Sequence, residues 1–142
     1  MKKQFYSLLT LILICLTSSV VQAVFTIAPV KLTINKDNRI ANLNLRNDND
    51  VPKSFQLIIY KVEYKNGKEV LKETEDLIAT PVMFRIGAGR TQLVRIALIN
   101  KMSYSRDQDA YRIAVKELPH RQAGIQSQVQ FVVEFRVPVT IG

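Results

Sequence analysis

Alternation of apolar and polar residues dominates the chain from residue 25 onward. The clearest case is VQFVVEFRVPVTI, residues 129–141, in which every odd-numbered position is apolar. A period of two predicts a β-strand with one apolar face. The run is about twice the usual strand length of roughly 5–6 residues. Its length raises the question of whether the whole face covers the protein's own core or whether part of it meets another protein.

Turn-forming residues separate this run from other alternating or apolar segments. Asn66-Gly67 is a hairpin signal, and Pro29 interrupts a strand in a way that is tolerated at a sheet edge. The pattern predicts seven or so strands and no helix, and therefore an all-β fold: an immunoglobulin-like seven-stranded antiparallel β-sandwich. The segments are residues 25–34 with the break at Pro29, 40–45, 54–64, the stretch after the hairpin signal around 70–71, 82–86, 91–99, 110–118 and 129–141.

The first 23 residues differ from the rest of the chain. Lys2 and Lys3 precede an unbroken apolar run at residues 8–16, and small residues follow up to Ala23. This order is typical of a cleavable secretory signal peptide, whereas an uncleaved anchor would be followed by a basic flank. We therefore expect a signal peptide at 1–23, one domain at 24–142 and a periplasmic location. The only cysteine, Cys15, lies in the leader, so the exported domain would have no disulfide.

Charge narrows the classes of partner. The whole chain has 20 basic and 12 acidic residues; without the two leader lysines the balance is 18 − 12, or +6. A basic exported domain could favour nucleic acid, an anionic surface or an acidic protein. The basic residues are scattered and form no block interleaved with aromatic residues, so solvated surface charge explains most of them and nucleic-acid binding is disfavoured.

Catalytic and metal-binding patterns are missing from the sequence. The single histidine, His120, follows Pro119 in an expected loop, with no cysteine or carboxylate cluster at ligand spacing. Residues 87–89, Gly-Ala-Gly, are expected to form a turn between strands and not a phosphate-binding loop. We expect neither an enzyme nor a bound cofactor or metal.

Several segments together resemble the N-terminal immunoglobulin-like domain of periplasmic pilus chaperones of chaperone–usher systems, the PapD-like family. Residues 76–96, DLIATPVMFRIGAGRTQLVRI, resemble the family pattern P-x-x-F/R-x-L-x-P-G-x-x-Q-x-x-R-I/V. Residues 111–119, YRIAVKELP, resemble Y-R-L-x-x-x-E-I-P, and NLNLRNDND at 42–50 resembles the second strand and its turn. The matches follow in order over nearly the whole expected domain.

The resemblance implies a function. Such chaperones complete the fold of a pilus subunit by lending it their last strand and deliver the subunit to an outer-membrane usher. By position, the lent row is Val129, Phe131 and Val133, extending to Phe135. Val137, Val139 and Ile141 would then belong to this domain's own core.

The same resemblance implies two charged sites. Lys31 and Arg136 would anchor the C-terminal carboxylate of the subunit, with the basic residue types exchanged relative to the usual arginine-then-lysine order. Arg95 and Asp109 would form a buried ion pair. Members of the family have two domains, and this chain ends at Gly142, where the interdomain linker is expected, so we expect the second domain to be absent.

Two alternatives remain open at this point. The chain could be a truncated, non-functional chaperone. It could also be an exported structural or adhesive sandwich that self-associates through its long last strand, because exposed edge strands readily pair with their own kind.

Overall fold

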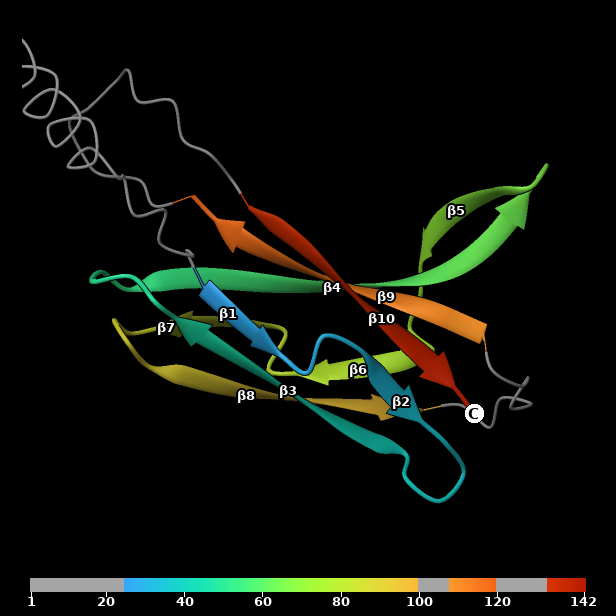
Figure 1. Cartoon of the computed structure of the whole chain (residues 1–142), viewed down its shortest axis with the longest axis horizontal. Helices are drawn as coiled ribbons and strands as arrows, with labels where there is room; N and C mark the ends of the chain where they lie inside the picture. The colour runs from blue at the N-terminus through green and yellow to red at the C-terminus, as the bar shows by residue number, and fades with distance from the viewer. Residues whose placement is uncertain (1–24, 100–107, 120–132) are drawn as a thin grey trace, which may run out of the picture.

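The computed structural model describes residues 25–99, 108–119 and 133–142 (Figure 1). All the regular elements in these ranges are β-strands, which confirms the predicted all-β class. No helix in the described ranges is long and apolar enough to cross a membrane. The strands are β1 (Phe25–Ala28), β2 (Leu32–Ile34), β3 (Ile40–Asn47), β4 (Lys53–Lys65), β5 (Lys68–Glu73), β6 (Leu77–Thr80), β7 (Met83–Ile86), β8 (Thr91–Leu98), β9 (Gln108–Leu118) and β10 (Glu134–Ile141).

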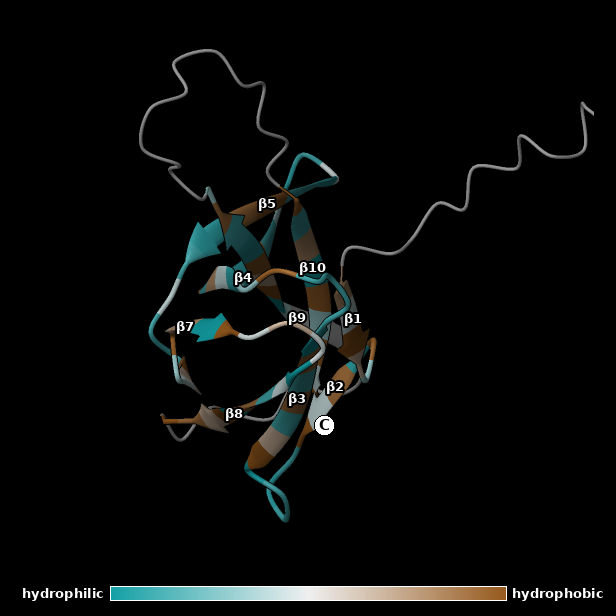
Figure 2. Cartoon of the chain, turned by 90° about the vertical axis from the view of Figure 1, so that its left-hand side faces the viewer, coloured by the Kyte–Doolittle hydropathy of each residue, from teal (hydrophilic) through white to brown (hydrophobic). Residues whose placement is uncertain are grey.

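The strands form two sheets that pack as an immunoglobulin-like sandwich. One sheet has the order β1-β3-β8-β6, and the other has the order β2-β10-β9-β4-β5 with β7 also paired to β4. Alternate residues of each strand point between the sheets, as the buried Leu43 and Leu45 of β3 illustrate. The resulting change between apolar and polar segments along β3 and β10 is visible in Figure 2.

The first predicted strand, residues 25–34, is in fact two strands that belong to different sheets. β1 pairs antiparallel with β3, whereas β2 pairs in parallel with β10. The break contains Pro29, which has no backbone N–H to donate to a sheet. Both strands lie at sheet edges, where a nearby proline is tolerated as expected.

β4 and β5 form the hairpin that Asn66-Gly67 predicts. Both turn residues have positive φ, 51° and 74°, as the favoured two-residue hairpin turn requires. β4 pairs with β9 up to Lys61 and with β5 from Tyr60 to Lys65, so its last residues extend past the body of the sandwich (Figure 1).

β6 was not predicted as a strand. It has only four residues, and the following Thr80-Pro81 reads as a turn. Leu77 and Ala79 are nevertheless buried, and the strand pairs with β8 at the edge of its sheet. Such a short segment gives too few alternations for a pattern to be recognised.

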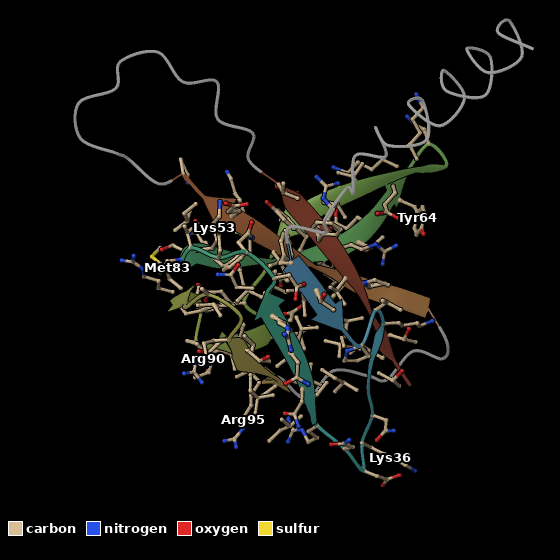
Figure 3. The ribbon with its side chains drawn as sticks, turned by 60° about the vertical axis from the view of Figure 1, so that its left-hand side comes forward. Lys36, Lys53, Tyr64, Met83, Arg90 and Arg95 are labelled. Atoms are coloured by element: carbon tan, nitrogen blue, oxygen red, sulfur yellow. The ribbon has the colours of Figure 1, made fainter. Side chains whose placement is uncertain are left out.

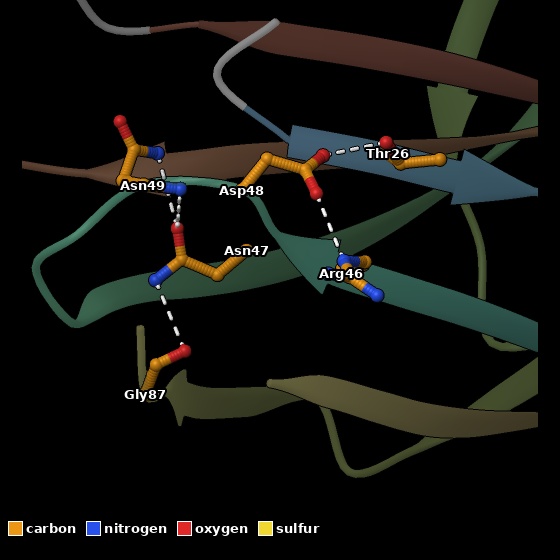
Figure 4. Close-up of polar contacts among 6 residues, drawn as sticks. All are labelled: Thr26, Arg46, Asn47, Asp48, Asn49 and Gly87. Atoms are coloured by element: carbon orange, nitrogen blue, oxygen red, sulfur yellow. Dashed lines mark hydrogen bonds and ion pairs between the residues drawn. The ribbon is translucent and has the colours of Figure 1, made fainter. Parts of the chain in front are cut away.

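Asn47 organises the turn after β3. This fully buried side chain donates through Nδ2 to the carbonyls of Val51 (2.8 Å), Ile86 (3.1 Å) and Gly87 (3.2 Å). Its Oδ1 accepts from the backbone and side-chain amides of Asn49 (Figure 4). All donors and acceptors of this buried amide therefore have partners, and the turn is tied to the segment that links β7 and β8.

A second polar contact holds β1 to the end of β3. Asp48 accepts a hydrogen bond from Thr26 and forms an ion pair with Arg46 at 3.0 Å (Figure 4). The position of β1 matters for the site below, because the first residue of this strand, Phe25, contacts β10.

Candidate functional site

The C-terminal half of β10 belongs to the core. Val137, Val139 and Ile141 are buried, with exposed fractions of 4%, 0% and 3%. From Val139 to Ile141 β10 lies between two strands, because β9 pairs on one side and β2 on the other. The prediction that these three residues belong to the core of this domain is confirmed.

The N-terminal half of β10 begins to leave the core at Phe135. This side chain lies on the same face as Val137 but is 48% exposed. Its ring contacts Phe25 of β1 edge to face, with the centroids 4.8 Å apart, and Phe25 contacts Phe55 of β4 in the same manner at 5.2 Å. Phe135 is thus the partly exposed end of an aromatic row that leads out of the sandwich.

Val133 precedes β10 and is partly buried against the core cluster. Its carbonyl accepts a hydrogen bond of 3.0 Å from the backbone N–H of Glu117. Val133 therefore contributes to this domain's own packing, which the strand-lending interpretation did not anticipate. The other two residues of the predicted row, Val129 and Phe131, lie outside the described residues.

One backbone edge of β10 is only half covered by strands. β9 pairs with β10 over the whole range Glu134–Ile141, whereas β2 pairs only with Val139–Ile141. In the described part of the chain no strand pairs with the other edge of Glu134–Pro138. An uncovered strand edge of this kind is a template for the addition of another strand.

Arg136 lies on the outer face of the six-stranded sheet, opposite to the buried row. Its Nε forms a hydrogen-bonded ion pair with Oε1 of Glu134 at 2.9 Å, and the two side chains are 57% and 34% exposed. A pair so exposed is worth only about 0–1 kcal/mol, so it competes weakly with an incoming carboxylate.

Lys31 is brought to the same side of the molecule as Arg136. It is exposed and immediately precedes β2, whose Leu32 lies opposite Val139 in a parallel register. Continued by one residue, this register puts Lys31 beside Pro138, two positions from Arg136 on the same face of β10. The pairing of β2 with β10 thus puts Lys31 next to the strand that carries Arg136, and their joint binding of a carboxylate stays a prediction.

Arg95 and Asp109 lie in different sheets. Arg95 is exposed on the outer face of β8, between the buried Val94 and Ile96, so the expected burial is not observed for this arginine. The backbone of Asp109 pairs with Thr140 in the other sheet, and its side chain lies outside the described residues. An ion pair between the two residues stays a prediction.

Lys53 and Glu117 form an ion pair that the sequence analysis missed. Lys53 Nζ lies 2.7 Å from Oε1 of Glu117, whose side chain is only 8% exposed. The sequence of β9 contained a signal for this pair. Tyr111, Ile113 and Val115 point inward at alternate positions, and the acidic Glu117 is the next residue of that buried series. The pair lies beside Val133, at the end of the sandwich where β10 leaves the core.

The opposite end of β9 carries a different polar contact. The buried Tyr111 donates through its hydroxyl to Oδ2 of Asp76 at 3.0 Å, and Lys61 Nζ lies 3.6 Å from the same oxygen. Burial in the first place, and then the hydrogen bond and the negative charge of Asp76, raise the pKa of the Tyr111 phenol well above its ordinary value.

A groove of about 730 Å³ lies between β4 and β6 and includes none of the predicted site residues. Its walls come from Leu57 and Ile59 of β4 and from the residues around Ile78. No group of three or more metal-ligating side chains occurs in the described ranges.

Comparisons with known proteins agree with one another. The chaperone protein FanE of Escherichia coli is 23% identical over 129 residues, which cover 91% of this chain and 54% of FanE. The chain thus spans about half the length of this relative.

Solved structures show the same fold. A chain of the CsuC–CsuE chaperone–tip adhesion subunit pre-assembly complex of Acinetobacter baumannii superposes with a TM-score of 0.66 at 20% identity, covering 82% of this chain and 55% of that one. The E. coli chaperone DraB gives a TM-score of 0.62 at 19% identity, with 81% and 53% covered. The complex of the Salmonella enterica SafA pilin with the SafB chaperone gives 0.63 at 14% identity, with 85% and 55% covered.

A family model settles the relationship. The model described as the pili and flagellar-assembly chaperone, PapD N-terminal domain, matches residues 24–141. This match covers the whole sandwich and includes the three segments on which the sequence resemblance rested. The chain therefore belongs to the PapD N-terminal domain family of pilus-assembly chaperones.

Proposed function

We propose that this domain binds pilus subunits in the periplasm by lending them a strand, and so assists their folding and their delivery to an outer-membrane usher. The observation that carries the proposal is the change along β10. The apolar row is buried at Val137 and half exposed at Phe135, where one backbone edge of the strand is also left without a partner strand in the described residues. A subunit that lacks a strand needs both an apolar row and a free edge.

The proposed contact comprises the row Val129, Phe131, Val133 and Phe135. Burial of a large apolar side chain contributes about 1.5–3 kcal/mol. Because Val133 already packs against this domain's core, the main contributions are assigned to the other three residues. Together they supply a gross driving force of about 4.5–9 kcal/mol.

Lys31 and Arg136 are proposed to hold the C-terminal carboxylate of the subunit. Charge-assisted hydrogen bonds from two cations would fix the subunit at one position along the strand, and a one-residue slip would turn its apolar row away from the lent one. The exposed Arg136–Glu134 pair costs little to exchange for the incoming carboxylate.

The partner class is supported by the similar structures. Two of them are complexes of a chaperone with a tip adhesion subunit or a pilin. The periplasmic location rests on this family and on the predicted leader at residues 1–23. The chain spans about half of its relatives' length. The activity of those full-length proteins is therefore attributed to this chain only as a proposal.

Co-purification with a pilus subunit that has a free C-terminal carboxylate tests the function. We expect the double change Val129→Asn and Phe131→Asn to abolish capture while leaving the urea midpoint of the domain unchanged. The matched control is Val82→Asn with Met83→Asn, two apolar residues that are 49% and 60% exposed away from β10. The control should retain capture.

Three outcomes would refute the strand-lending proposal. Unfolding of the domain by the Val129 and Phe131 changes would show that these residues belong to its own core. Equal loss of capture in the control would show that any exposed apolar residue suffices. Homopolymers of the unmodified protein, with no heterocomplex in size-exclusion chromatography, would favour the self-associating structural domain instead.

A further inference from the structure

Four lysines lie on one face of the β4–β5 hairpin. The register places Lys61 opposite Lys72 and Lys65 opposite Lys68, with Glu63 and Val70 between these two pairs. Residues two or four positions apart on a strand share a face, so all four ammonium groups project to the same side. We refer to Lys61, Lys65, Lys68 and Lys72 as the lysine face.

The lysine face is electrostatically unfavourable for an isolated hairpin. Like charges directly opposite each other on paired strands are destabilising. Only Lys61 has an acidic partner among the described residues, Asp76 at 3.6 Å, whereas Lys65, Lys68 and Lys72 are exposed without a carboxylate within 4.0 Å. With Glu63 counted, this face carries four positive charges and one negative charge, and the excess of positive charge fits an anionic surface outside the molecule.

The other face of the hairpin has a different character. It carries Tyr60, Val62 and Tyr64 of β4 opposite Glu73, Leu71 and Glu69 of β5, and Glu69 is paired with Arg112 at 3.1 Å. The charges of the hairpin are partly sorted by sign, because all four lysines lie on one face whereas Glu69 and Glu73 lie on the other. Here the lysines are segregated from the aromatic residues, and the exposed Tyr64 lies near the hairpin tip on the face opposite to the lysines (Figure 3).

The residue types favour a diffuse anionic surface over a shaped acidic site. All four cations are lysines, which are strongly hydrated point charges, and none is an arginine with the planar fork that binds carboxylates in pairs. Of the four, none lines the groove between β4 and β6.

We propose that the lysine face binds the surface of an anionic phospholipid bilayer. The face lies at the Tyr111 end of β9, whereas Phe135 and Val133 lie near Val115 and Glu117 at its other end. Membrane binding therefore leaves the half-covered edge of β10 accessible, and it would hold the domain at a membrane surface while that edge is in use. The inference does not depend on strand lending.

Co-sedimentation of the exported, purified protein with lipid vesicles tests the proposal. One set of vesicles contains phosphatidylcholine mixed with an equal amount of phosphatidylglycerol, and the other contains phosphatidylcholine alone. We expect binding only to the first set, and we expect it to be lost when the salt is raised from about 0.1 M to about 1 M, because screening shortens the Debye length from about 10 Å to 3 Å.

The variant Lys65→Gln, Lys68→Gln, Lys72→Gln removes the three lysines that have no acidic partner among the described residues. A lysine near an anionic surface strengthens binding by about fivefold, so the triple variant should bind about 100-fold more weakly. The matched control is Lys36→Gln, Arg85→Gln, Arg90→Gln, which removes the same net charge from exposed positions. Lys36 and Arg90 lie well away from Tyr64 in Figure 3. The control should bind almost as well as the unmodified protein.

Several results would overturn the proposal. These are an absence of binding to the mixed vesicles, equal binding to both sets, or an equal loss in the two triple variants, which would assign the effect to net charge alone. Tighter binding to a poly-glutamate peptide than to vesicles would assign the face to an acidic protein. If the hairpin variant instead oligomerises while vesicle binding persists, the lysines protect the β5 edge from association.

Discussion

The two halves of β10 have the same alternating pattern but different surroundings. From Val137 to Ile141 the apolar side chains are almost completely buried, and the strand is paired on both edges from Val139 onward. At Phe135 the apolar side chain is 48% exposed, and in the described residues only β9 pairs with this part of the strand. Alternation alone therefore predicts which face of a strand is apolar, but not what covers it.

The polar contacts beside the two halves differ as well. Next to the buried half, Tyr111 lies opposite Val139 and is fixed by its hydrogen bond to Asp76. Next to the exposed half, Glu117 donates its backbone N–H to Val133 and pairs with Lys53. The C-terminal half of β10 is therefore part of the core, and its N-terminal half lies at the edge of the core.

The largest expected effect comes from a change in the buried half. Ile141→Ala removes most of a side chain that is 3% exposed, and we expect a loss of about 2–5 kcal/mol in the free energy of unfolding. Urea denaturation measures this loss. A loss below that of Phe135→Ala would contradict the distinction between the two halves.

Tyr111→Phe tests the polar contact beside the buried half. It removes a hydrogen bond to a carboxylate, with an expected cost of about 1.5–3 kcal/mol at neutral pH. The pKa of the phenol is raised in the folded state, so its stabilising contribution is fully present below the unfolded value of about 10 and is lost as the pH rises above it. Stability should therefore fall between about pH 9 and 11, and less steeply in the variant. Equal slopes in the two proteins would show that this phenol does not cause the fall.

Phe135→Ala probes the exposed half. Full burial of a phenylalanine would give a loss of about 3–5 kcal/mol, but half exposure and the single described ring contact with Phe25 reduce the expected loss to about 1–2 kcal/mol. We expect Phe135→Ala to weaken subunit capture more than it lowers stability. Ile141→Ala is the control, because it should lower stability more than it weakens capture. Phe135→Leu, which keeps an apolar side chain, should restore most of the capture.

Glu134→Gln should have the smallest effect on stability. The Arg136–Glu134 pair is largely exposed, so its loss should change the free energy of unfolding by less than about 1 kcal/mol. Because the variant frees Arg136 for an incoming carboxylate, we expect capture of a subunit with a free C-terminus to become several-fold tighter. A subunit with an amidated C-terminus should show no gain. The same gain for both would exclude a carboxylate anchor at Arg136.

Much of the fold could be predicted because alternation is a local property of the chain. The strands around Leu43, Phe55 and Val94 were expected close to where they are observed, and the Asn66-Gly67 hairpin has the expected turn geometry. β6 was missed because four residues next to a proline show too little pattern. The separation of residues 25–34 into strands of two sheets was missed because it depends on which partners β1 and β2 find.

The site could be predicted only in part, for a similar reason. The placement of Lys31 next to β10, the strand that carries Arg136, follows from the parallel pairing of β2 with β10, which no local pattern encodes. The expected burial of Arg95 was wrong because the alternation in β8 turns this residue to the outer face. Glu117 could have been noticed as an acid at an inner position of β9, but its partner Lys53 is 64 residues away in sequence.

The sequence by itself determined an all-β chain, the apolar face of each long strand and membership of a chaperone family, because these depend on local patterns and on residue order. The tertiary structure decided where the single apolar row of β10 changes from core to surface. That boundary depends on how far the facing sheet extends: Phe25 of β1 meets Phe135 at the end of the aromatic row, and beyond β2 no described strand pairs with the remaining edge of β10. Burial is a property of the assembled sheets, and a strand cannot encode it without the strands that cover it.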